Sequence, residues 1–159
     1  MADLATTYTL TTPGGTITFN NGDLGDGTDK YWIQNIEGLD GPIVRAPVDD
    51  VPFGDGTIIH TFWKSGRRPI FDGVLIIETV LPWGSGCQEA LNDMEDALRV
   101  ALTSIISADG TLGWQPAGLS ARTLTVRHPG NPPFSMRPIE NFALRQFDFT
   151  LVSEDAEWA

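Results

Sequence analysis

Two histidines and one cysteine are the residues of this chain best suited to metal binding or nucleophilic catalysis. His60 and His128 lie far apart in the sequence, and Cys87 stands alone at the start of a predicted helix. Zinc sites use four such ligands when structural and three when catalytic, at characteristic short spacings, and the sequence has no such spacing. A thiol near a helix N-terminus can have a lowered pKa, but Cys87 has no activating partner nearby. We predict a small structural residue at Cys87, with no metal and no cofactor.

The segment 21–32 carries four oxygen-bearing side chains that suggest a calcium loop: Asn21, Asp23, Asp26 and Asp29. Aligned from Asn21, an EF-hand loop would place Gly25 where a ligand is needed and Trp32 where a bidentate glutamate is needed. The EF-hand pattern therefore fails. We predict a polar, acidic loop, and a looser calcium site is the alternative.

Enzymatic motifs are missing from the sequence. Gly84-Ser85-Gly86 lacks the glycine spacing of a nucleophile elbow, and no phosphate-binding loop is present. Carboxylate pairs such as Asp49-Asp50 are most often solvated in an acidic chain. We predict that the protein is not an enzyme and has no catalytic residue.

One basic cluster beside a tryptophan is the best candidate for a contact site. Trp63, Lys64, Arg67 and Arg68 fall within six residues of a chain whose first sixty residues hold nine acidic and two basic side chains. Tryptophan and arginine are enriched at interface hot spots. We predict these four residues at a subunit interface, and a tryptophan-based carbohydrate platform is the competing interpretation.

Composition limits the class of protein that can carry this cluster. The 159 residues have a formal net charge of −11, 41% hydrophobic residues and a single cysteine. This hydrophobic fraction excludes a disordered chain, the charge disfavours non-specific nucleic-acid binding, and one cysteine excludes an internal disulfide. No run is long enough to span a membrane. We predict one domain over residues 1–159.

The elements that must position the cluster are mostly strands. Tyr8–Thr12 and Thr16–Phe19 flank Pro13-Gly14-Gly15 and predict a hairpin. The segments 57–63 and 69–80 predict a second hairpin with its tip near Ser65-Gly66. Asp72-Gly73 predicts a bulge or break in its second arm, and a second bulge is possible between Leu144 and Phe147. Further strands are predicted at 111–114, 122–128 and 141–152.

One segment, 85–108, has the three-and-four spacing of an amphipathic helix. The predicted helix is about 20–22 residues long, with Ser85 and Gln88 in a capping-box pattern and Gly110 as its C-cap. Its apolar side chains are Leu91, Met94, Leu98, Ala101, Leu102, Ile105 and Ile106. The sequence therefore predicts a mainly β (α+β) domain, a split β-barrel or sandwich with one long packed helix and an extended β-hairpin.

The order of these features resembles the N-terminal, ring-forming domain of distal tail proteins of long-tailed, non-contractile bacteriophages. The resemblance rests on the hairpin at 8–19, the segment Ile36–Arg45, the hairpin through Phe62 and Arg67–Gly73, the single helix, and the closing strand followed by an acidic turn at Phe147–Asp155. It covers nearly the whole chain.

The resemblance implies a structural virion protein of the phage tail tip, assembled in the host cytoplasm. Six copies would form a ring that joins the tail tube protein to the hub and adhesion proteins of the baseplate, with genome DNA passing through the lumen without specific binding. Many relatives have a C-terminal galectin-like domain, and none is expected here. The alternatives are another tail ring protein (tail tube or tail terminator) and a carbohydrate-binding β module.

Overall fold

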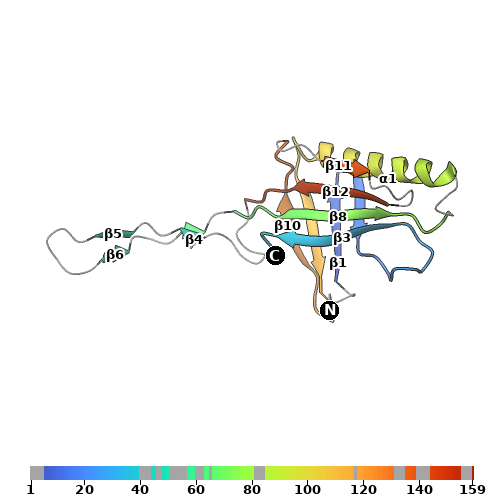
Figure 1. Ribbon diagram of the computed structural model, residues 1–159. Helices are drawn as coiled ribbons and strands as arrows, with labels where there is room; N and C mark the ends of the chain where they lie inside the picture. Colours follow the sequence, from blue (N-terminus) through green and yellow to red (C-terminus); the bar gives the residue numbers. More distant parts are fainter. Residues whose placement is uncertain are drawn as a thin grey trace.

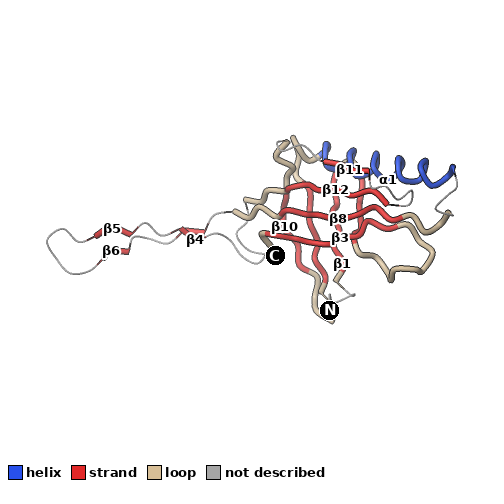
Figure 2. Tube along the Cα trace, in the orientation of Figure 1, coloured by secondary structure: helices blue, strands red, loops and turns tan. Residues whose placement is uncertain are grey.

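The computed structural model describes residues 6–39, 44–45, 48–50, 57–59, 63–64, 66–80, 85–116, 118–130, 135–138, 144–154 and 159. In this part of the chain, one eight-stranded sheet curls around a hydrophobic core and one helix packs on it (Figure 1). Figure 2 shows how strongly strands dominate the fold. The predicted mainly β fold with one long helix is confirmed.

The sheet consists of two halves, in the order β10-β9-β1-β2 and β3-β8-β12-β11. The first half contains β10 (Arg122–Val126), β9 (Gly110–Gln115), β1 (Thr7–Thr12) and β2 (Gly15–Phe19). The second half contains β3 (Lys30–Glu37), β8 (Ile70–Ile76), β12 (Leu144–Thr150) and β11 (Ser135–Pro138). All neighbouring strands are antiparallel except β2 and β3, which are parallel and share one registered pair, Phe19 with Tyr31.

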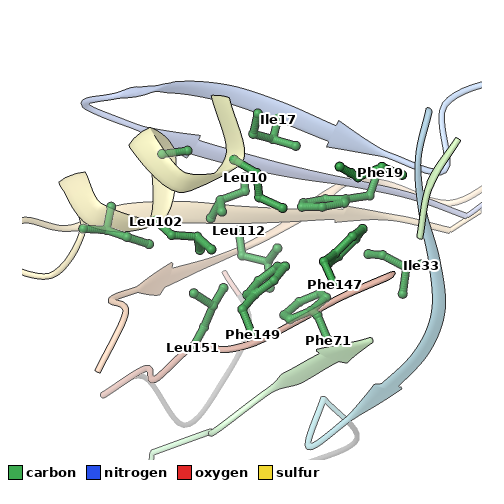
Figure 3. Close-up of a cluster of buried hydrophobic side chains, with 14 of the residues drawn as sticks. Leu10, Ile17, Phe19, Ile33, Phe71, Leu102, Leu112, Phe147, Phe149 and Leu151 are labelled. Carbon is green, nitrogen blue, oxygen red and sulfur yellow. The ribbon is translucent and has the colours of Figure 1, made fainter. Parts of the chain in front are cut away.

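The core lies between the two halves because the sheet folds back on itself. Tyr8 of β1 and Phe71 of β8 have ring centroids 6.5 Å apart, although three strand spacings of about 4.8 Å would separate these strands in a flat sheet. Phe71 stacks on Phe149 at 4.9 Å, and Phe19 lies 6.0 Å from Phe149. Figure 3 shows these rings between the strands, with Leu10, Leu112 and Leu151 beside them.

The curled sheet is not closed into a barrel by its regular strands. Beyond the ends of β10 and β12, Arg127 and Val152 form an isolated antiparallel bridge. Thr123 and Ala159 also exchange two backbone hydrogen bonds, of 3.0 and 2.9 Å. These pairings bring Val152 and Ala159 against the free edge of β10 and its continuation, which gives the predicted split, sandwich-like form.

The helix α1 (Ser85–Ser104) covers one open side of this core, next to β1, β2 and β8 (Figure 1). Its 20 residues agree with the predicted length, and Leu91, Leu98 and Leu102 are buried. The predicted C-cap is wrong, because Gly110 opens β9 and Ile106 is 49% exposed. Among the described residues, no helix is long and apolar enough to cross a membrane.

The second predicted hairpin, between 57–63 and 69–80, is wrong, although an extended β-hairpin is present elsewhere in the chain. We use the term arm for β4 (Val44–Arg45), β5 (Val48–Asp50), β6 (Thr57–Ile59) and β7 (Trp63–Lys64), in which β4 pairs with β7 and β5 with β6. The two antiparallel pairings define the arm, and Gly66 is at its base. The strand β8 pairs instead with β3 and β12, because the backbone N–H and C=O groups of a buried strand need hydrogen-bond partners on both edges. Figure 1 shows β4, β5 and β6 projecting away from the sheet.

Two bulge predictions have different outcomes. The register of β3 against β8 shifts between Ile33 and Asn35, opposite Asp72-Gly73, so the irregularity predicted there lies on the partner strand. The register of β12 against β8 is regular from Leu144 to Thr150, so the predicted bulge there is wrong. Leu144 is only half-buried, and the core pattern begins at Phe147.

Candidate interaction surfaces

The base of the arm is held by three segments of the same chain. Arg67 is only 8% exposed, its guanidinium donates a hydrogen bond to the Leu39 carbonyl, and its backbone exchanges two hydrogen bonds of 3.0 and 2.9 Å with Ser153. The Pro69 carbonyl accepts a further bond from the Leu151 amide. Of the four residues predicted at an interface, Arg67 therefore acts within its own subunit.

Two glycines permit this close packing. A Cβ at Gly66 would lie 2.0 Å from the Ser153 carbonyl oxygen. A Cβ at Gly38, which has a φ of +77°, would lie 2.5 Å from the Arg68 carbonyl oxygen. Real Cβ atoms do not approach backbone oxygens at these distances. Ser65-Gly66 looked like a turn in the sequence, but Gly66 is needed there because another segment passes against it.

One further basic side chain of the predicted cluster, that of Arg68, is available for contacts outside the subunit. Arg68 is exposed at the base of the arm. Trp63 and Lys64 form β7, where Lys64 pairs with Val44 and Trp63 with Arg45; their side chains lie outside the described set. The strand pairing adds Arg45 to the basic cluster, and only a correct prediction of the arm could have found it.

Charge changes sign along the arm. The ladder nearer the sheet contains Arg45 and Lys64, whereas the outer ladder contains Asp49 and Asp50. The arm thus has a basic base and an acidic outer part.

The outer face of the second half-sheet is acidic, and the sequence analysis missed it. Glu37 of β3, Asp72 of β8 and Asp148 of β12 line a hollow of about 230 Å³ there. Asp72 and Asp148 are directly opposite each other in the antiparallel register, a position where like charges destabilise a sheet. The Gln146 amide donates to Asp72 at 3.2 Å and offsets part of this cost. Only the register of the strands brings these side chains together.

The predicted acidic loop is organised around a lysine. The Lys30 ammonium is buried and donates to the Asn21 carbonyl at 2.9 Å, to both Asp26 oxygens at 2.8 Å and to the Thr28 hydroxyl at 2.7 Å. The bonds from Lys30, together with those from the Thr28 hydroxyl and amide to Asp26, lower the pKa of Asp26 to about 2. An ammonium therefore binds two of the four residues that suggested calcium, Asn21 and Asp26, whereas Asp29 accepts hydrogen bonds from Glu78 and Thr79.

The residues considered for chemistry are dispersed. Cys87 is fully buried, and burial raises the pKa of its thiol, which disfavours the nucleophilic thiolate. His128 is also buried, with its Nδ1 accepting a bond from the Gly130 amide, and His60 lies outside the described residues. In the described part of the chain, no group of three or more His, Cys, Asp or Glu residues is arranged to hold a metal.

Comparison with solved structures shows the class of fold that these surfaces belong to. No protein-family profile and no curated protein sequence matches the chain. Its fold is similar to the crystal structure of the SPP1 Dit (gp 19.1) protein, described as a paradigm of the hub adsorption apparatus in phages that infect Gram-positive bacteria, with 13% identity and a TM-score of 0.56.

Two chains of the phage p2 baseplate in its activated conformation, with strontium and with calcium, are also similar. They have 12% identity each and TM-scores of 0.60 and 0.62. The matches cover 94% of this chain for Dit and 97% for each baseplate chain, but only 50% and 45% of those chains. The chain thus has the fold of phage tail-tip hub proteins and spans about half the length of the proteins it resembles. The resemblance found in the sequence is confirmed at the level of the fold.

Proposed function

We propose that this protein is a structural subunit of a phage tail tip. Copies of the chain, six in our proposal, form a ring that joins the tail tube to the adhesion apparatus of the baseplate, and DNA passes through the ring. The proposal is supported mainly by the fold, because Dit and baseplate chains match 94–97% of this chain. Its place is the virion tail, after assembly in the host cytoplasm, and its partners are the tail tube protein and the hub and adhesion proteins.

Unlike surfaces on one subunit favour a ring. A cyclic assembly with more than two copies needs two different patches, one on each side of the subunit. The basic base of the arm, with Arg68, Lys64 and Arg45, is one such patch, and the acidic outer ladder and acidic sheet face supply surfaces of opposite charge.

The acidic sheet face suits a lumen through which DNA passes. The acidic side chains of Glu37, Asp72 and Asp148 line this face and would repel the phosphate backbone. DNA could then slide past without being held by ion pairs of the kind that DNA-binding proteins form. In this proposal the face of β3, β8 and β12 points toward the ring axis.

Charge reversal at the arm base tests the ring. Arg68→Glu changes an exposed side chain, whereas Arg67 is unsuitable because its guanidinium is buried and bonded to Leu39. The matched control is Arg99→Glu on the exposed side of α1, which alters the net charge equally. We expect native mass spectrometry to show loss of the ring for Arg68→Glu and an intact ring for Arg99→Glu. Equal assembly of both variants would refute the role of the arm base.

A further inference from the structure

The outer face of the first half-sheet is formed almost entirely by threonine. In β1, β9 and β10 the buried side chains Leu10, Leu112 and Leu124 alternate with outward ones. The outward positions are Thr7, Thr9 and Thr11 in β1, Thr111 in β9, and Thr123 and Thr125 in β10. In β2 they are Thr16 and Thr18, on either side of the buried Ile17. We refer to this surface as the threonine face.

The threonine face has no charged residue at its outward positions. Gly113 and Gln115 of β9 are its only other members. This is unusual in a chain with a formal net charge of −11, and it contrasts with the second half of the same sheet, where Glu37, Asp72 and Asp148 face outward. One continuous sheet therefore has one neutral and one acidic outer half.

The middle of the threonine face is hollowed. Gly113 pairs with Thr9 on one side and Thr123 on the other, and these residues line a hollow of about 270 Å³. A Cβ at Gly113 would meet only ordinary contacts, the nearest 3.6 Å away. The folded chain therefore has room for a larger side chain at this position, and glycine leaves a recess that a protruding side chain can fill.

Burying threonine side chains in a contact costs little conformational entropy. Its branched Cβ restricts χ1, so little side-chain freedom is lost on contact, whereas ordering long charged side chains carries a larger entropic cost. Cross-strand pairs such as Thr9 with Thr18 and Thr11 with Thr111 further fix the surface.

We propose that the threonine face is the surface on which a second copy of this chain docks, an inference that rests on the proposed ring. Two copies that each carry a net charge of −11 repel one another wherever their acidic surfaces meet. At the threonine face a copy can approach without placing a like charge opposite another or desolvating an ion. The electrostatics thus select this face for contact with an acidic partner such as the chain itself. DNA would find no basic side chain on it to neutralise its phosphates.

The threonine face is smaller than a complete subunit interface. Four strands about 4.8 Å apart, each with five residues of about 3.4 Å, span roughly 19 by 17 Å, or about 320 Å². A stable interface buries about 800 Å² on each partner. The threonine face is therefore the centre of a contact that the surrounding surface must complete.

Thiol labelling tests the docking directly. Cys87 is fully buried, so wild-type protein offers no exposed thiol among its described residues. Thr11→Cys places one thiol on the face, and Thr103→Cys places a matched control on the exposed side of α1. We expect assembly to slow maleimide labelling of Thr11→Cys by about tenfold, because the contact must open before the reagent can enter, and to leave Thr103→Cys unchanged. Equal labelling of Thr11→Cys before and after assembly would overturn the proposal.

Added charge gives a second readout. Thr11→Glu with Thr123→Glu should abolish assembly, while Thr103→Glu should not, with circular dichroism confirming the fold of each. If wild type and the double variant assemble equally, the docking surface is overturned and the proposed ring stands. If wild type remains a single copy at every concentration, both are overturned. If duplex DNA alone protects Thr11→Cys while the mass stays that of one copy, the face binds nucleic acid and the proposal is overturned.

Discussion

Gly66→Ala should detach the base of the arm from the body of the protein. The new Cβ would lie 2.0 Å from the Ser153 carbonyl oxygen. This oxygen belongs to the backbone, so no rotamer change relieves the clash and the two segments must separate. The two Arg67–Ser153 hydrogen bonds would then be lost, at about 0.5–1.5 kcal/mol each. We expect unfolding free energy to fall by about 1–3 kcal/mol, and the melting temperature by about 2–12 °C at about 2–4 °C per kcal/mol.

The assay combines thermal denaturation with amide hydrogen exchange, which should show faster exchange at Arg67 and Ser153 than in wild type. Gly113→Ala is the matched control, because its Cβ meets only ordinary contacts and reduces the freedom of the unfolded chain. It should keep or slightly raise the melting temperature. If Gly66→Ala melts like wild type and keeps both amides protected, the role assigned to the arm base is wrong.

Lys30→Met should raise the pKa of Asp26 from about 2 toward its ordinary value of 3.8, because the ammonium that stabilises the carboxylate is gone. NMR titration of the carboxyl group measures this pKa, and an unchanged value would contradict the role of Lys30 in the loop. Burial lowers the pKa of His128 below 6.5, so the folded state disfavours the protonated imidazole. Stability therefore falls as the pH drops through the pKa of this histidine in the unfolded chain. His128→Asn should flatten the dependence of melting temperature on pH between about 7.5 and 5.5. Arg145→Ala removes the guanidinium that forms an ion pair between β12 and Glu95 of α1. The free energy of unfolding, measured by urea denaturation, should fall by about 1–3 kcal/mol. An unchanged free energy of unfolding would mean that this ion pair does not stabilise the fold.

Local patterns predicted the elements whose pairing is local. The first hairpin follows from alternation around Pro13-Gly14, and the register of β1 against β2 agrees with it. The helix follows from the spacing of Leu91, Leu98 and Leu102, which are all buried. In both cases neighbouring residues carry the whole signal.

Elements that depend on distant partners were missed or misplaced. The strand β3 has an irregularity between Ile33 and Asn35 that interrupts its alternation, so no period-two pattern marks it. The arm was misplaced because Ser65-Gly66 has the composition of a turn, whereas the need for Gly66 arises from Ser153, far away in the sequence.

The candidate surfaces also differ in how far local sequence could predict them. The basic cluster was visible as a sequence run, but the burial of Arg67 and the proximity of Arg45 to Lys64 depend on tertiary pairing. The acidic and threonine faces each combine strands from distant segments. Their residues are unremarkable in the sequence, and strand order alone gathers them.

Imaging the purified protein by electron microscopy, together with its native mass, tests the central claim most directly. We predict a single-layer ring of six copies with an open centre. Rings that stack and grow into tubes would indicate a tail tube protein instead. Single copies that bind glycans with quenching of tryptophan fluorescence would contradict the ring and favour a carbohydrate-binding module.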